Sequence, residues 1–302
     1  MDVFEEIDYL INVDPAGRGV RCLYKAARKG TPLCLEAARI MRQITGDQDV
    51  VGITTGFPII PPGKPETDGP PGAIMLGRAV EELGATPLFL VGELSLDLIC
   101  ALLRKSGLEN AEIRVVPTDR EESERFCNSI VNEFDFSLII SVEKPGIAEN
   151  GLYYNMVGED VSSEVGKIDR LFVRALDKGI PTIGVGDGGN DIGMGNVRRA
   201  VEKNVSYGDK IASETKVQSI VTGGVSNWGA YGILAALSVI TDQQFVHRAD
   251  FEREMIEACI DAGAVDGVSK DSECSVDSIP CDFNANMVQM LRYLSAGETL
   301  KF

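Results

Sequence analysis

Histidine is nearly absent from this chain of 302 residues, in which His247 is the single example. One imidazole excludes a zinc site built from several histidines and any mechanism that needs two imidazoles. His247 lies in the segment QQFVHRADFERE, which is predicted to be helical, and a structural role is expected for it. Acid–base chemistry in this chain is therefore expected from carboxylates, lysine or metal-bound water.

Closely spaced cysteine pairs and long apolar runs are also lacking. The seven cysteines are odd in number and form no CxxC, which argues against an oxidised scaffold or a zinc ribbon and predicts reduced thiols. No uninterrupted apolar run of ~18 residues occurs, so no membrane span is predicted. The first residues, MDVFEEIDYLINVDP, lack the basic segment of a signal peptide. We therefore expect a cytoplasmic protein with no membrane partner.

Positive charge is scarce, because 29 lysines and arginines face 46 aspartates and glutamates, for a net charge of −17. A chain this acidic is repelled by phosphate backbones and by anionic lipid surfaces, which argues against nucleic-acid and membrane binding. The acidity fits a protein that holds cations, although a solvated acidic surface is the more common cause.

Short apolar runs alternate with segments of helical periodicity along most of the chain. The predicted strands cover residues 49–56, 86–92, 111–117, 136–146, 181–191 and 219–227, and the predicted helices 73–85, 95–107, 120–134, 167–179 and 228–241. This alternation predicts an α/β fold with a mostly parallel sheet and helices on both faces.

The two ends of the chain are expected to pack around this sheet. Residues of about 1–45 form a helical region, and residues of about 243–302 form a C-terminal region, in which 271–282 is a hairpin or a surface loop. No low-complexity linker divides the sequence. Residues 1–302 are therefore predicted to form one α/β domain.

Four loops rich in glycine or proline each follow a predicted strand directly. In open parallel sheets, ligands bind in the crevice beyond the carboxyl ends of the strands, so these loops are expected to converge on one site. The polar residues that they would bring together are Glu66, Asp68, Glu143, Lys144, Asp187, Asn190, Asp191, Ser226 and Asn227.

The loop GVGDGGNDIGMGN (184–196) is the strongest signal in the sequence. Its glycines let the backbone fold tightly around Asp187, a suitable hard ligand for Mg²⁺ or Mn²⁺. Asn190 can bind a substrate oxygen, and Asp191 is a second candidate ligand or orients the first. The alternative is a glycine turn whose aspartate caps the following helix.

The same loop is similar to the GDGxNDxxM motif that holds Mg²⁺ in haloacid-dehalogenase-type phosphatases. Those enzymes also need a DxDx[TS] nucleophile after their first strand, and the corresponding strand here reads VVGITTG, without an aspartate. The similarity therefore supports a carboxylate metal loop and argues against membership of that family.

The loops 61–73 and 141–161 supply further carboxylates. Glu66 and Asp68 lie two residues apart in the proline-rich loop, which presents both to one cation unless it is only a solvated surface loop. Glu143 completes the metal set or acts as general base, and Lys144 neutralises an anionic substrate or pairs with a neighbouring carboxylate. Asn155, in the same loop as Glu143, is a candidate for substrate binding.

Two further segments are candidates for binding an anionic substrate. Ser226 and Asn227 lie at the start of a helix, which is either an anion site or an ordinary helix cap. Arg18 lies between glycines in DPAGRGVRCL (14–23), and an arginine in such a loop can clamp a phosphate or a carboxylate.

Five segments together resemble the C-terminal domain of the D-glutamate cyclase family. They read TTGFPI, KPETDGPPGA, NGLYYNMVG, GVGDGGNDIGMG and GVSNWGAYG, and they follow in order between about residues 50 and 240. The resemblance implies cyclisation of D-glutamate to 5-oxo-D-proline with loss of water. The chain departs from the family near its C-terminus, where it reads Asn284-Ala285-Asn286-Met287 in place of a His-Ala-Glu-Met-like stretch.

Three functions are weighed on these residues. The first is a hydrolase that uses one or two Mn²⁺ or Mg²⁺ ions, most plausibly a phosphatase in which metal-activated water attacks a small phosphorylated metabolite. Its catalytic residues would be Asp187, Glu143 and Lys144. The second is D-glutamate cyclase, which the resemblance implies. The third is a non-catalytic metal-binding protein. The expected partner is a small anionic metabolite, and a homo-oligomer is an open alternative to a monomer.

Overall fold

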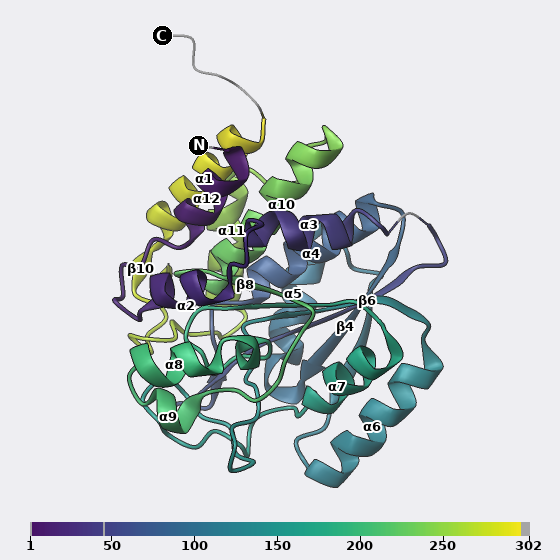
Figure 1. The fold of residues 1–302 in the computed structure, drawn as a ribbon, viewed down its shortest axis with the longest axis vertical. Coiled ribbons are helices and arrows are strands. Elements are labelled where there is room, and N and C mark those ends of the chain that lie inside the picture. Colours follow the sequence, from purple (N-terminus) through teal and green to yellow (C-terminus); the bar gives the residue numbers. More distant parts are fainter. Residues whose placement is uncertain (1, 45, 297–302) are drawn as a thin grey trace.

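Six strands form one parallel sheet in the computed structural model, which describes residues 2–44 and 46–296. Every neighbouring pair is parallel, in the order β5-β4-β1-β6-β7-β8, so the predicted α/β fold is confirmed (Figure 1). The strands are β1 (Val50–Thr55), β4 (Thr86–Gly92), β5 (Glu112–Val116), β6 (Phe136–Val142), β7 (Thr182–Gly186) and β8 (Ser219–Thr222).

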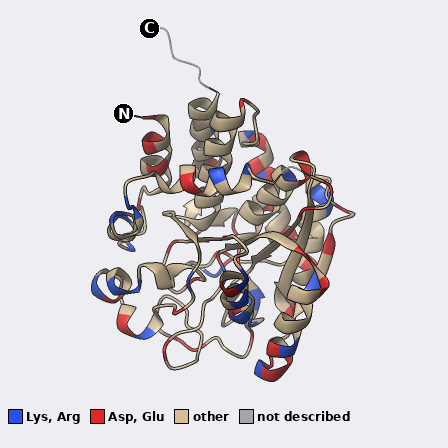
Figure 2. Cartoon of the chain, turned by 45° about the vertical axis from the view of Figure 1, so that its right-hand side comes forward, with Lys and Arg blue, Asp and Glu red and all other residues tan. Residues whose placement is uncertain are grey.

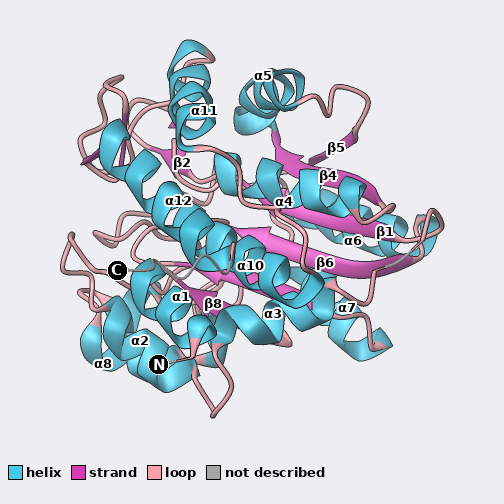
Figure 3. Ribbon diagram, turned by 90° about the horizontal axis from the view of Figure 1, so that it is seen from above, coloured by secondary structure: helices cyan, strands magenta, loops and turns pink. Residues whose placement is uncertain are grey.

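Helices cover both faces of this sheet. On one face α4 (Pro70–Glu82) and α10 (Ser226–Thr241) lie across the strands (Figure 3), with α3 (Leu33–Met41) and α5 (Leu96–Ser106) beside them. On the other face α6 (Arg120–Glu133) packs against α7 (Asp169–Lys178), which contacts β7. Helix α10 is apolar around almost its whole circumference because other elements enclose it on all sides.

The two terminal regions form an outer layer. Helices α1 (Val3–Ile11) and α12 (Cys281–Ser295) pack on α10, while α11 (Ala249–Asp261) packs on α5 and α12. The C-terminal region therefore reaches the sheet mainly through the inner helices. Positions 45 and 297–302, which the sequence places at the ends of the two terminal regions, lie outside the described residues.

Short elements complete the chain. Helix α2 (Val20–Ala27) contacts β8 and α8 (Arg198–Asn204), which is followed by α9 (Gly208–Ile211). The pair β2 (Pro58–Ile59) and β3 (Lys64–Pro65) folds the loop after β1, and η1 (Glu93–Ser95) and η2 (Met194–Asn196) are single 3₁₀ turns. Within 271–282 the structure forms a hairpin of β9 (Ser275–Val276) and β10 (Ile279–Pro280), one of the two forms expected there.

The strand order reverses direction at β1. The chain first builds outward through β4 and β5 and then returns to add β6, β7 and β8 on the other side of β1. The connections that follow β1 and β6 therefore lead to helices on opposite faces of the sheet, and such a reversal opens a crevice where ligands bind in doubly wound sheets. Glu143 follows β6 directly at this point, and the loop after β1 carries Glu66 and Asp68.

Charged residues of both signs are spread over the outer helices (Figure 2). All seven cysteines are free thiols, as expected from their spacing. Among the described residues, no helix combines the length and the apolar character that crossing a membrane would require.

Candidate functional site

A cavity of about 240 Å³ lies at the carboxyl ends of the central strands. This volume is somewhat smaller than the ~300–1,000 Å³ that ligand pockets usually occupy, which suits a small metabolite. Phe57, Pro58, Ile59 and Ile60 supply an apolar wall from the loop after β1. The charged and amide side chains that line it include Arg18, Glu66, Glu143, Asn155, Asp187, Asn190 and Asp277.

Three carboxylates meet at the inner end of the site. One oxygen from each of Asp68, Glu143 and Asp187 lies within 4.8 Å of the others, and all three side chains are buried. They come from the loops after β1, β6 and β7, which confirms that these loops converge. The backbone of Glu143 has a φ of 44°, a left-handed conformation that costs energy in a residue other than glycine.

Burial makes these carboxylates harder to ionise. It raises the pKa of Asp68 from 3.8 to about 8, with the charge of Asp277 as the next contribution. Burial also raises the pKa of Glu143 and of Asp187 well above the ordinary range. A divalent cation stabilises the ionised forms of such a cluster, because its charge replaces the lost hydration.

Arg18 is the cation in contact with this cluster. Its Nη1 donates to Asp187 and to Asp277, the latter at 2.7 Å. Asp14 accepts hydrogen bonds from the backbone N–H groups of Arg18 and Gly19, both at 2.9 Å, which shapes the loop between α1 and α2. Gly19, with a φ of 86°, has no room for a Cβ because the carbonyl of Asn204 lies against it. The loop therefore aims the guanidinium into the cavity.

Asp277 was not predicted as a site residue. It lies in the two-residue turn of the β9–β10 hairpin, at a φ of 54°, and reaches the cavity from a segment outside the parallel sheet. The pair Asp277–Ser278 between SV and IP is a hairpin signal in the sequence. Nothing in that signal indicates which distant loop the turn would meet.

Two polar side chains on the cavity wall carry unused oxygens. Glu66 and Asn190 are 5% and 2% exposed, and Glu66 Oε1 and Asn190 Oδ1 have no hydrogen-bond partner in residues 2–44 and 46–296. The amide nitrogen of Asn190 donates to the carbonyl of Tyr154 at 2.9 Å, so its oxygen is the free end. Buried polar atoms without a partner are rare in folded proteins, so both oxygens are candidates for contact with a ligand.

Ser226 and Asn227 lie beneath the cluster and do not line the cavity. Their backbone N–H groups donate to Asp68 at 2.9 and 2.8 Å, so the anion at the start of α10 is a side chain of the protein. Ser226 Oγ donates to Glu143, and Asn227 Oδ1 accepts from the N–H groups of Gly69 and Gly72 at the start of α4. In this structure the two residues hold the carboxylates, and their contact with a substrate stays a prediction.

Three other predicted residues occupy distinct positions. Asp191 lies against Gly186 beside Glu143, and burial raises its pKa to about 6. Asn155 lies at the cavity wall, where its Oδ1 accepts from the N–H of Glu159 at 2.9 Å. Lys144 does not line the cavity: its Nζ lies 3.4 Å from the carbonyl of Gly56, and burial lowers its pKa to about 8.

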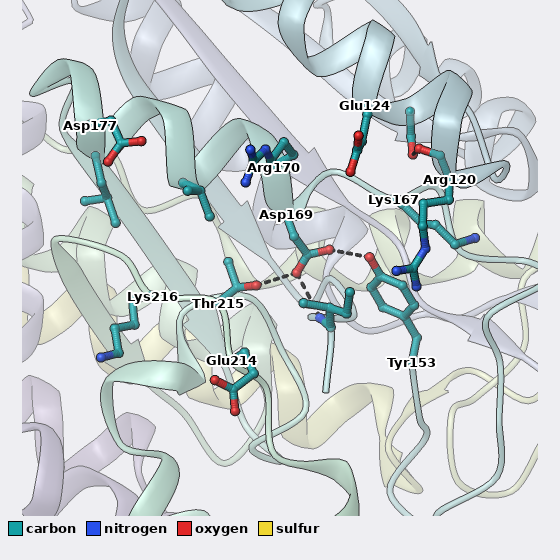
Figure 4. A pocket seen from close by; sticks show the side chains of 14 residues that line it. Arg120, Glu124, Tyr153, Lys167, Asp169, Arg170, Asp177, Glu214, Thr215 and Lys216 are labelled. Atoms are coloured by element: carbon teal, nitrogen blue, oxygen red, sulfur yellow. Dashed lines mark hydrogen bonds between the residues drawn. The ribbon is translucent and has the colours of Figure 1, made fainter. Parts of the chain in front are cut away.

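Asp169, at the start of α7, connects the loops behind the site (Figure 4). Its carboxylate accepts from the N–H of Ile147 at 2.9 Å, from the hydroxyl of Tyr153 at 2.6 Å and from the hydroxyl of Thr215. The loop after β6 is also tied to the Asp187 loop, because the N–H of Gly146 donates to the carbonyl of Asn190 at 2.8 Å. Asp169 thus holds the segments that carry Glu143 and Asn190, a role that no sequence pattern indicated.

Comparison with known proteins matches this chain to one family. The family model described as D-glutamate cyclase-like, C-terminal, matches residues 7–292. The human protein D-glutamate cyclase, mitochondrial, is 32% identical over 247 residues, which are 78% of this chain and 38% of the human protein. The chain therefore spans less than two thirds of the length of that relative.

The prediction of a phosphatase-type hydrolase is wrong. Both matches carry the name of a cyclase, and neither points to phosphate chemistry. The error has a physical origin. A glycine-rich loop that presents an aspartate can suggest that a cation is bound, but it does not indicate which bond of a substrate is broken. The resemblance drawn from the five sequence segments is confirmed.

Proposed function

The chain belongs to the D-glutamate cyclase-like C-terminal family, and on this premise we propose that its acidic cavity cyclises D-glutamate to 5-oxo-D-proline. The observation that carries the proposal is the cavity itself, in which buried carboxylates and one arginine meet at the point where the strand order reverses. Its small volume suits a ligand the size of an amino acid.

We propose that Mn²⁺ or Mg²⁺, as one or two ions, is the cofactor. Asp68, Glu143 and Asp187 would hold it, with Glu66 and Asp191 as further oxygen ligands. The residues fit such an ion, because hard divalent cations prefer oxygen donors and Glu66 Oε1 is a buried oxygen without a partner in the described part of the chain. When bound, the ion would polarise the side-chain carboxyl group of the substrate as a Lewis acid.

The reaction joins two groups of the same molecule. The α-amino nitrogen forms a bond to the side-chain carboxyl carbon, one carbon–oxygen bond of that carboxyl breaks, and the oxygen leaves as water. The two protons lost by the ammonium group equal the two gained by the leaving oxygen, so the reaction needs a proton carrier and no net acid. Glu143 is our candidate, as a carboxylate that would bind the ion through one oxygen and carry the proton on the other, because Ser226 Oγ donates to its Oε2 and so orients the group.

Arg18 is proposed to bind the α-carboxylate of the substrate. It is the guanidinium in the cavity, and guanidinium groups match the geometry of carboxylates. Asn155 and Asn190 are proposed to complete the substrate contacts from the cavity wall. A cytoplasmic location and a homo-oligomeric state remain predictions, and the matched human relative carries the word mitochondrial in its name.

Product analysis tests this function. The metal-free chain is incubated with D-glutamate or L-glutamate, with and without Mn²⁺, and 5-oxoproline is quantified by chromatography on a chiral column. We expect 5-oxo-D-proline only with D-glutamate and metal, and its loss in Glu143→Gln. Tight Mn²⁺ binding without any product would contradict the proposal and leave a non-catalytic metal-binding protein.

A further inference from the structure

Arg18 shares a carboxylate with the proposed cation site. Asp187 contributes an oxygen to the cluster with Asp68 and Glu143, and it also accepts from Arg18 Nη1. A divalent cation held by the cluster and the guanidinium of Arg18 would both be positive charges at this one group. Because the site is buried, the repulsion between the two positive charges is weakly screened. The cation and the guanidinium therefore compete for the carboxylate of Asp187.

The guanidinium has a second anchor and unused donors. Nη1 makes both contacts of the side chain, to Asp187 and, at 2.7 Å, to Asp277 on the β9–β10 hairpin. Nε and Nη2 hold no hydrogen bond with any residue that the structure describes, although the side chain is only 14% exposed. Arginine has five N–H donors in a planar fork that fits a carboxylate, so a large part of its capacity is free here.

We propose that Arg18 is an exchangeable counter-ion, which yields Asp187 to the divalent cation and then binds the carboxylate of the anionic substrate. Asp277 keeps the guanidinium in the cavity during this exchange. The cation therefore binds before the anion, and the metal-free site disfavours anions because Asp187 and Asp277 offset the charge of Arg18 and the remaining carboxylates repel an anion. The inference rests on the proposed metal site and adds the order of binding.

Removing Arg18 then has opposite effects on the two ligands. Without the competing guanidinium, the cluster binds a cation more tightly, and without the fork the site binds a dicarboxylate more weakly. A purely structural role of Arg18 would weaken both. Linkage also requires that the cation and the anion strengthen each other's binding by the same factor in the wild type.

The experiment is a calorimetric titration of the metal-free chain of 302 residues. Mn²⁺ is titrated into wild type, Arg18→Met and Arg21→Met. Arg21 is exposed and forms no ion pair in residues 2–44 and 46–296, so the control removes the same charge three residues away. We expect Arg18→Met to bind Mn²⁺ about ten-fold more tightly or better, and Arg21→Met to change the affinity less than about two-fold. Equal or weaker binding by Arg18→Met overturns the inference.

A second titration measures the binding of an anion to the wild type and to Arg18→Met. Glutarate, a dicarboxylate without the amine that cyclisation needs, is titrated with and without Mg²⁺. We expect Mg²⁺ to tighten glutarate binding about ten-fold or more in wild type, and Arg18→Met to lose glutarate binding even with Mg²⁺ present. Equal glutarate affinity of the wild type with and without Mg²⁺ also overturns the exchange.

The outcomes separate this inference from the proposed function. A wild type that binds neither Mn²⁺ nor Mg²⁺ overturns the metal site and the exchange together. If Arg18→Met binds Mn²⁺ more tightly and glutarate more weakly, the exchange is supported. If the wild type then shows no turnover of D-glutamate, the cyclase function is contradicted.

Discussion

At the scale of single residues, the site is defined by charges that are buried without equal compensation. Six carboxylates are buried there, and Arg18 contacts two of them, Asp187 and Asp277. The six are Glu66, Asp68, Glu143, Asp187, Asp191 and Asp277. Burial of like charges without compensation is costly, so proteins keep such an arrangement where it serves a ligand. The contribution of each residue can be tested by removing its charge without changing its shape.

Asp187→Asn is expected to weaken Mn²⁺ binding about 100-fold or more, because it removes one of three converging ligand oxygens. The variant should stay folded, since Arg18 keeps its bond to Asp277 and one repelling carboxylate is gone. Calorimetric titration measures the Mn²⁺ affinity, and thermal unfolding of the metal-free protein measures whether the variant stays folded. Asp209→Asn, at an exposed position on α9, is the control, and unchanged Mn²⁺ affinity in Asp187→Asn would contradict the metal site.

Lys144→Met is expected to stabilise the protein near pH 7, by up to about 3 kcal/mol. Burial lowers the pKa of Lys144 from 10.5 to about 8, so below pH 8 the folded state carries the full cost of a buried ammonium. As the pH rises from about 8 to about 10.5, the unfolded state binds the extra proton and the wild type gains stability. Urea unfolding at pH 7 should therefore give a higher free energy of unfolding for Lys144→Met than for the wild type. At pH 10 most of this difference should disappear. A less stable variant at pH 7 would show that the charge of Lys144 is compensated.

At the scale of elements, the active geometry depends on loops held from behind. Asp169 on α7 binds Ile147 and Thr215, and the loop that contains Ile147 is bonded in turn to the Asp187 loop. The starts of α10 and α4 are held in the same way, through Asp68 and Asn227. Helix termini need partners for their free N–H groups, and here those partners also position the cluster.

Asp169→Asn is expected to lower the free energy of unfolding by about 2 kcal/mol, because an amide cannot accept all the donors that face this carboxylate. It should also weaken Mn²⁺ binding several-fold through the displaced loops. The matched control is Asp177→Asn, which removes a carboxylate at an exposed position of the same helix. Unchanged Mn²⁺ affinity in a destabilised Asp169→Asn would limit the residue to a structural role.

At the scale of the whole molecule, acidity and stability are coupled. Burial raises the pKa of Asp191 to about 6 and that of Asp68 to about 8, so the folded state holds protons that the unfolded chain has lost. Their contribution to stability is complete below about pH 4 and is lost as the pH rises through about 6 and about 8. With a net charge of −17, general repulsion acts in the same direction as the pH rises.

The metal-free protein is therefore expected to melt at a lower temperature at pH 8 than at pH 5.5, and Mn²⁺ should remove most of the loss. Calorimetric melting at both pH values, with and without Mn²⁺, measures the effect. Ca²⁺ in place of Mn²⁺ tests whether any divalent charge suffices. A melting temperature that rises between pH 5.5 and pH 8 without metal would show that the cluster is ionised and compensated in another way.

Much of this architecture could be predicted from local patterns. Apolar runs predicted all six strands of the parallel sheet, and β4 was predicted with its observed bounds, because a buried parallel strand must be apolar on both faces. The position of Asp68, Glu143 and Asp187 in loops that follow predicted strands predicted that they converge, since parallel strands end at one edge. Lys144, next to Glu143, was predicted at the same site but does not line the cavity. Adjacent residues point in different directions, and the sequence does not show which of the two side chains faces the cavity.

The sequence by itself determined the fold class, the family and the loops that carry the carboxylates, because these depend on periodicity and on short local strings. Only the tertiary structure decided that Asp277 joins the cluster, that Arg18 contacts Asp187, and that Asp68 rather than a ligand occupies the start of α10. Those contacts join residues between 158 and 259 positions apart. They arise from the strand order and the packing of the outer layer, which bring together side chains that no local pattern relates.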